Sequence, residues 1–183
     1  MSSVKIAKAE ADHEPSEGQV QADIASARRT LLAEVRGLEA LAQSLGDAFI
    51  KAVDQLEAVA GRVIVTGMGK SGHVGCKMAA TLASTGTPAQ FVHPAEASHG
   101  DLGMITRKDA IVALSNSGNT PELASVIAYS RRFDIPLLAI TGKANSILAE
   151  ACDTLLLLPP AEEACPMGLA PTTSTTIDRK SVV

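Results

Sequence analysis

Two glycine-rich loops, each directly after a short apolar run, constrain the fold of this chain most. The first loop, residues 67–72 (Gly-Met-Gly-Lys-Ser-Gly), follows the run 62–66, and the second, residues 115–120 (Ser-Asn-Ser-Gly-Asn-Thr), follows 110–114. In a doubly wound parallel sheet, loops at the carboxyl ends of strands line the ligand crevice. Backbone N–H groups at the helix N-termini there favour anions. The two loops together predict a phosphorylated small molecule bound between them.

Five short apolar runs alternate with stretches of helical spacing after residue 61. They predict strands at 62–67, 89–93, 110–115, 136–141 and 153–158, and helices at about 70–85, 120–133 and 144–151. This alternation is typical of right-handed crossovers in a parallel sheet. We therefore expect an α/β fold, a doubly wound five-stranded parallel sheet in the flavodoxin-like order 2-1-3-4-5. In that order the first and third strands flank the point where the winding reverses, which brings the two loops together.

The segment before the first strand has a helical pattern from residue 20 to residue 60. Its apolar residues recur at steps of three and four, as in Ile24, Leu31, Leu32, Val35, Leu38, Leu41 and Leu45. Gly46 and Asp47 predict a helix stop and the N-cap of a second helix, which Gly61 closes. We expect an N-terminal helical hairpin that covers the sheet or a neighbouring subunit. Residues 1–18 are expected to form a disordered leader, and residues 19–183 one domain.

The composition excludes several classes of protein. The net charge is −4 and no basic patch is visible, which argues against nucleic acid as a partner. No apolar stretch approaches the ~20 residues of a membrane span, and no signal-peptide core is visible. The three cysteines lack metal-ligand spacing, so we expect a reducing, cytoplasmic environment. We expect no metal site, because the spacing of His93, His99 and Asp101 matches no strong ligand motif.

The glycine-rich loops fit a phosphate site better than two alternatives. Gly67, Gly69 and Gly72 also satisfy the dinucleotide pattern G-x-G-x-x-G, but the second strand ends at His93-Pro94 without the expected acidic residue. A P-loop would need glycine where Ile64 stands. Both alternative motifs are therefore incomplete. The predicted phosphate-binding residues are Gly69, Lys70, Ser71, Ser115, Ser117 and Thr120, and Gly67 is a predicted substrate contact.

From Gly61 to about Thr176 the chain resembles a sugar isomerase (SIS) domain, in detail those of D-arabinose 5-phosphate isomerases. The matching segments are 67–73, 84–88, 92–104, 115–118, 163–166 and 168–172. The resemblance implies interconversion of D-arabinose 5-phosphate and D-ribulose 5-phosphate through an enediol, without a redox cofactor. It also implies a place in the synthesis of the octulosonic acid sugar (Kdo) of lipopolysaccharide. The implied partner is a sugar phosphate, and the implied state is a homo-oligomer, a tetramer in a full-length protein.

The resemblance also assigns catalytic residues. Aldose–ketose isomerisation needs a base, a proton donor and stabilisation of the developing oxyanion. Lys70, His99, Glu122 and Glu163 match functional positions of the family. Lys70 would anchor the substrate and His99 would assist ring opening or orient a hydroxyl, while either glutamate could be the base. Thr172 and Thr173 are predicted substrate contacts, and His73 and His93 are expected to be structural.

The end of the chain departs from the family pattern. Residues 169–176 predict a helix start, but the charged, non-periodic residues that follow give that helix no continuation. The last six residues can be encoded by a sequencing-library adapter, so we expect a C-terminal truncation with an artefactual tail at 178–183. An inactive fragment of the isomerase is therefore one alternative. The other is a non-catalytic sugar-phosphate sensor, although residues 20–60 offer too little positive charge for a DNA-binding module.

Overall fold

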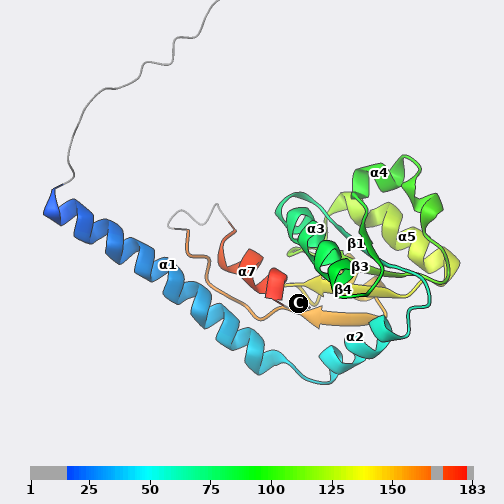
Figure 1. Cartoon of the computed structure of the whole chain (residues 1–183), viewed down its shortest axis with the longest axis horizontal. Coiled ribbons are helices and arrows are strands. Elements are labelled where there is room, and N and C mark those ends of the chain that lie inside the picture. Colours follow the sequence, from blue (N-terminus) through cyan, green and yellow to red (C-terminus); the bar gives the residue numbers. More distant parts are fainter. Residues whose placement is uncertain (1–15, 166–170, 181–183) are drawn as a thin grey trace, which may run out of the picture.

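The computed structural model describes residues 16–165 and 171–180 (Figure 1). Its strands are β1 (Val63–Gly67), β2 (Ala89–Phe91), β3 (Ala110–Leu114), β4 (Leu137–Thr141) and β5 (Thr154–Leu157). The α-helices are α1 (Glu17–Ser44), α2 (Asp47–Glu57), α3 (Gly69–Ser84), α4 (Pro94–Ser98), α5 (Ala124–Phe133), α6 (Ile147–Ala151) and α7 (Thr173–Lys180). Two short 3-10 helices are η1 (Asp101–Met104) and η2 (Pro121–Leu123).

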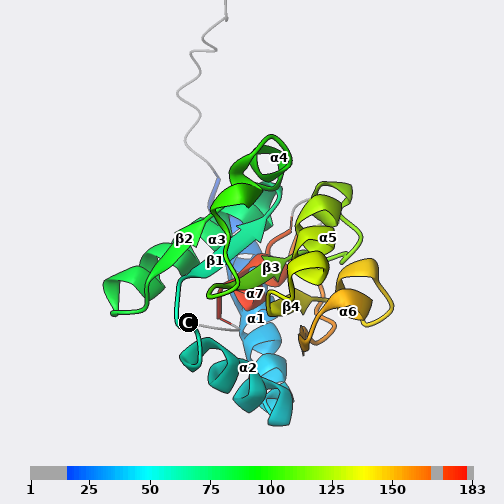
Figure 2. The same ribbon diagram turned by 90° about the vertical axis from the view of Figure 1, so that its right-hand side faces the viewer.

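The five strands form one parallel sheet in the order β2-β1-β3-β4-β5, which confirms the predicted fold class. The central strands β1, β3 and β4 are fully buried, because helices cover both faces of the sheet (Figure 2). β1 and β3 pair in register, with Gly67 opposite Leu114. The turns that follow these two strands therefore start side by side at the carboxyl edge of the sheet.

Alternate side chains of the strands fill two apolar layers. On one face Val65, Val112 and Ile140 pack with residues of α2, α3 and α7. On the other face Ile64 and Ile111 pack with residues of α4, α5 and α6. Each such side chain contributes about 1.5–3 kcal/mol when it is fully buried. These two layers fix the sheet edge that carries the candidate site.

The two predicted N-terminal helices form, with shifted boundaries; α1 packs against α7 and α2 packs against β5. Ser16 caps α1 by accepting a hydrogen bond from the backbone of Gln19, so residues 16–18 belong to the start of this helix. The other residues of the expected leader, 1–15, lie outside the described residues. Gly46, and not Asp47, is the N-cap of α2, which ends at Glu57 before it reaches Gly61.

The chain end also differs from expectation. The predicted helix start is confirmed, but the helix continues as α7 to Lys180 and is not absent. Its Ile177 is buried under the sheet, which gives the short helix an apolar anchor. Asp178 to Lys180 of the expected tail belong to α7, and 181–183 lie outside the described residues. In the part of the chain that the structure describes, no helix has the length and apolar character needed to cross a membrane.

Candidate active site

The loop after β3, residues 115–120, is held by its own hydroxyl groups. The Ser115 side chain is buried, and its Oγ lies 2.7 Å from Oγ1 of Thr120. The same Oγ accepts a hydrogen bond of 3.0 Å from the backbone N–H of Gly118. Gly118 has φ +65°, a conformation that favours glycine. Ser117 is exposed and accepts a 3.3 Å bond from the Asn119 N–H, so its hydroxyl remains accessible to a ligand.

The loop after β1 leads directly into the long helix α3. Gly69 has φ +58°, and an added Cβ on Gly72 would lie 2.6 Å from the carbonyl oxygen of Gly67. This contact between backbones requires glycine and docks α3 closely against the end of β1. Lys70 is exposed in the first turn of α3, where an ammonium can reach an anion. Ser71 donates a hydrogen bond of 3.5 Å to the buried carboxylate of Asp178 in α7.

A third loop, residues 141–146 at the end of β4, was not predicted; it supports the loop after β3, residues 115–120, which we call the serine loop. The Thr141 hydroxyl donates to the Asn116 carbonyl at 3.3 Å, and the Gly142 N–H donates to the same oxygen at 3.1 Å. An added Cβ on Gly142 would lie 2.7 Å from Oδ1 of Asn116. Lys143 follows and is exposed at the rim. A sequence signal was available, because Gly142-Lys143 directly follows an apolar strand just as Gly69-Lys70 follows the first.

A cavity of about 260 Å³ opens at this edge of the sheet. It lies between the serine loop, the third loop, residues 158–163 after β5 and helix α7. Its lining residues are Asn116, Gly142, Lys143, Leu158, Pro159, Pro160, Ala161, Glu163, Ser174 and Ile177. One carboxylate and one ammonium therefore line a space that is otherwise amide, hydroxyl and apolar. That is the composition of a pocket for a small polar ligand.

Glu163 is bound to the start of α7. Its Oε2 accepts hydrogen bonds from the Thr172 N–H (2.7 Å), the Thr172 hydroxyl (3.0 Å) and the Ser174 N–H (3.4 Å). Burial raises the pKa of Glu163, but the hydrogen bonds from Ser174 and Thr172 outweigh that effect and hold the pKa below its usual value of 4.5. The carboxylate is therefore ionised at neutral pH and is a weaker base than an ordinary glutamate.

The other predicted site residues are placed as follows. Glu122 in η2 and His99 at the C-terminus of α4 are exposed, and α4 packs against η2. Both follow carboxyl ends of strands, but among the described residues no hydrogen bond or ion pair links either side chain to Lys70 or Glu163. Thr172 contacts Glu163 directly. Thr173 is fully buried and its methyl group lies against α1, so its side chain does not line the cavity.

Two further histidines, His73 and His93, are not among the residues that line the cavity. Nδ1 of His93 accepts a hydrogen bond of 3.3 Å from the Ala95 N–H and so caps α4, which agrees with the expected structural role. His73 is exposed on α3. In residues 16–165 and 171–180, no cluster of three histidine, cysteine or acidic side chains could hold a metal ion.

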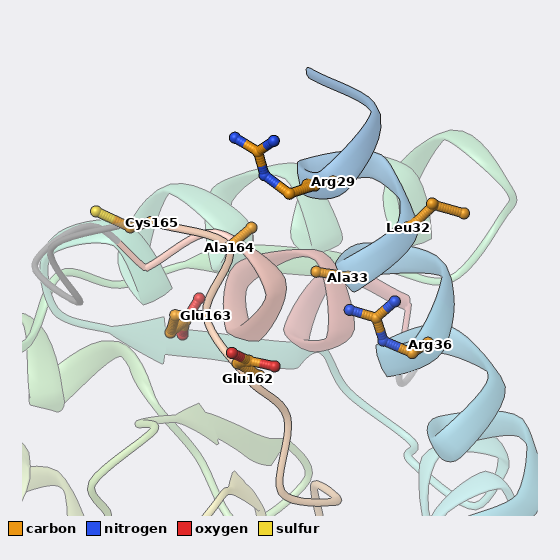
Figure 3. Close-up of a pocket in the computed structure, with 8 residues that line it drawn as sticks. All are labelled: Arg29, Leu32, Ala33, Arg36, Glu162, Glu163, Ala164 and Cys165. Atoms are coloured by element: carbon orange, nitrogen blue, oxygen red, sulfur yellow. The ribbon is translucent and has the colours of Figure 1, made fainter. Parts of the chain in front are cut away.

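A second cavity, of about 400 Å³, lies on the other side of Glu163 (Figure 3). Arg29 and Arg36 of α1 extend from one side of it, and Glu162 and Glu163 lie across from them. The segment 162–165 thus separates this cavity from the one at the serine loop.

The fold and the loops define a class of protein: a doubly wound α/β domain with two glycine-containing turns side by side at its winding reversal. Within that class the SIS domain family model matches residues 58–178, so the chain belongs to the SIS domain family. Arabinose 5-phosphate isomerase KdsD of Pseudomonas aeruginosa is 54% identical over 154 residues, which are 84% of this chain and 47% of that protein. The chain thus spans about half the length of the curated relatives it matches.

Two solved structures are also similar to this chain. An Escherichia coli CFT073 protein in complex with arabinose 5-phosphate has a TM-score of 0.83 and 34% identity, covering 88% of each chain. A putative sugar-phosphate isomerase from Listeria monocytogenes has a TM-score of 0.85 and 26% identity, covering 88% of this chain and 85% of that one.

Proposed function

We propose that this chain carries the active site of an aldose–ketose isomerase that interconverts D-arabinose 5-phosphate and D-ribulose 5-phosphate. The observation that carries the proposal is the serine loop beside a cavity that also holds Glu163. We place the phosphate at Ser115–Thr120, beside this cavity, which Asn116 of the same loop lines. The relatives named arabinose 5-phosphate isomerase and the structure in complex with arabinose 5-phosphate support this choice of substrate.

The proposed reaction moves one proton between neighbouring carbons. A base removes the proton on C2 of the open-chain aldose, an enediol forms, and the proton returns to C1 while the C2 hydroxyl becomes the ketone. The hydrogen bonds that weaken Glu163 as a base favour Glu122 for this step. Glu163 then holds a substrate hydroxyl, Lys70 stabilises the oxyanion or the phosphate, and His99 assists ring opening.

The wider role follows from the same substrate. We propose that the reaction supplies the pentose unit for the octulosonic acid sugar of lipopolysaccharide and takes place in the cytoplasm, in a homo-oligomer. A phosphorylated pentose is dianionic near neutral pH and does not cross a membrane unaided. It therefore stays in the compartment where it is made, which favours the cytoplasm.

The experiment is a conversion assay with arabinose 5-phosphate, with ribulose 5-phosphate as the measured product. Glu122→Gln is expected to lower kcat by at least ~100-fold, the usual contribution of a general base. Glu163→Gln removes a hydrogen bond between a charged group and the substrate, so it should weaken substrate binding by about 10- to 150-fold. Glu150→Gln, on the exposed side of α6, is the matched control and should retain activity. Binding of arabinose 5-phosphate by calorimetry without any conversion would refute the isomerase and favour a sugar-phosphate sensor.

A further inference from the structure

Helix α7 carries a buried carboxyl group that contacts the predicted phosphate site. Asp178 is 1% exposed, and α7 packs against both α3 and α1. Oδ2 of Asp178 lies 3.5 Å from Oγ of Ser71, which stands in the first turn of α3 and is one of the predicted phosphate ligands. An acidic side chain is therefore held away from water and against a hydroxyl group that is expected to bind an anion.

The surroundings of Asp178 favour its uncharged form. Burial has the largest effect on its pKa, and the negative charge of Glu163 acts in the same direction. The hydrogen bond from Ser71 lowers the pKa but does not outweigh them, so that the pKa of Asp178 rises to about 7. Near neutral pH the folded chain therefore exists in two forms, one with and one without this proton.

Other ionisable side chains stand on the two helices that pack against α7. Those within one turn of Ser71 on α3, or of Gly37 where α1 meets α7, are Lys70, His73, Glu34, Arg36 and Glu39. All of them except the half-buried Glu34 are exposed. None of the five is among the groups that shift the pKa of Asp178 in the described part of the chain. The proton on this carboxyl group thus responds to burial, to Ser71 and to Glu163.

The proton on Asp178 determines which way the Ser71 hydroxyl group points. A serine hydroxyl has one proton to donate and lone pairs that accept. An ionised Asp178 only accepts, so Ser71 donates to the carboxylate and presents its lone pairs to a ligand. A protonated Asp178 can donate to Oγ of Ser71, which leaves the Ser71 proton for the ligand. A phosphate dianion accepts hydrogen bonds and repels a carboxylate, so both effects favour the protonated form.

We propose that Asp178 is a positioning residue of the phosphate site: its protonated carboxyl group directs the Ser71 hydroxyl toward the phosphate of the substrate, and phosphate binding is coupled to retention of that proton. The inference rests on the proposed function, because it takes Ser71 as a ligand of a sugar phosphate. The proton comes from solvent and stays on Asp178, so the sugar itself is unchanged. Affinity should then fall as the pH rises above 7, where the phosphate ester is already dianionic.

Titration calorimetry with arabinose 5-phosphate at pH 7 and pH 8.5 tests this coupling on the whole chain. The dissociation constant should rise about 10- to 20-fold over this range, because the protonated fraction of a group that titrates at about 7 falls from roughly one half to roughly 3%. At pH 8, titrations in buffers of different ionisation enthalpy should show uptake of about one proton per bound ligand.

Asp178→Asn retains the size of the side chain and a donor for Ser71 but carries no charge. Its dissociation constant should change by less than about twofold between pH 7 and pH 8.5, and the proton uptake should disappear. Asp54→Asn, at an exposed position of α2, is the matched control and should keep the pH dependence of the unsubstituted chain. Urea unfolding of each variant at both pH values separates loss of the fold from loss of affinity.

Ser71→Ala tests whether the coupling passes through the hydroxyl group. It should weaken binding about tenfold at pH 7 and lose most of the pH dependence. Full pH dependence in Ser71→Ala or in Asp178→Asn would overturn the inference. So would equal affinity of the unsubstituted chain at both pH values, and each of these results leaves the proposed function intact. No binding of arabinose 5-phosphate at either pH would refute the proposed function and this inference with it.

Discussion

Replacing Ser115 by alanine should damage both the stability of the fold and the affinity for a phosphate. The buried hydroxyl of Ser115 is bound to Thr120 at 2.7 Å and to the Gly118 N–H at 3.0 Å. The Gly118 N–H keeps a second acceptor, the Ser115 carbonyl oxygen at 3.0 Å, so the loss is one full hydrogen bond and part of another. At about 1 kcal/mol per bond, the free energy of unfolding should fall by about 1–2 kcal/mol. For a domain of this size that lowers Tm by roughly 2–8 °C.

Ser117→Ala is the matched variant that separates the two effects. Its hydroxyl is exposed and accepts one long bond, so the free energy of unfolding should change by less than about 0.5 kcal/mol. If both hydroxyls bind the phosphate, each variant loses a bond to a charged group and binds arabinose 5-phosphate about 10- to 150-fold more weakly. Urea unfolding and titration calorimetry give the two quantities. A Ser115→Ala chain as stable as the unsubstituted one, or a Ser117→Ala chain with full affinity, would refute the reasoning.

Three more predictions concern the surroundings of this loop. Burial raises the pKa of Asp178 to about 7, so between about pH 4 and pH 7 the folded chain keeps this proton, whereas the unfolded chain loses it near 3.8. The free energy of unfolding should therefore fall by about 2–4 kcal/mol as the pH rises from 4 to 8. Asp178→Asn should flatten this pH dependence, as measured by urea unfolding at several pH values. Gly72→Ala places a Cβ against the Gly67 carbonyl and should cost about 1–3 kcal/mol together with phosphate affinity; an unchanged urea midpoint would contradict the tight contact. Lys143→Ala should leave the unfolding free energy within about 0.5 kcal/mol but weaken binding of arabinose 5-phosphate about tenfold, and full affinity by calorimetry would show that this ammonium does not reach the ligand.

The sheet was predictable because its strands are buried on both faces. A continuous apolar run such as 110–114, bounded by polar residues, is typical of a strand buried on both faces, and its alternation with helices predicts a parallel sheet. Helix α4 and η1 were missed because five and four residues show no helical period. The apolar pattern of α1 was detected, but periodicity shows which residues share a face and not what covers it. In the structure Leu31 is exposed, whereas the face of α1 that is buried contains the small residues Ala33 and Gly37.

The candidate site was predictable to the extent that it follows the first and third strands. The role of Glu163 as a hydrogen-bond acceptor at the α7 N-terminus was not, because its partners Thr172 and Ser174 come nine and eleven residues later in the chain, too far for a local sequence pattern to link them. The roles of Lys70, His99 and Glu122 stay predictions, since among the described residues no hydrogen bond or ion pair joins these exposed side chains to the rest of the site.

The contact between Gly142 and Asn116 limits how this site can change. Since the backbone after β4 touches the amide of Asn116, a bulkier residue at 142 or a longer turn there would displace the serine loop. The two turns must consequently be exchanged together in protein engineering. Replacing residues 115–120 by those of a relative with another sugar preference should give a folded site only when residues 141–146 are replaced as well.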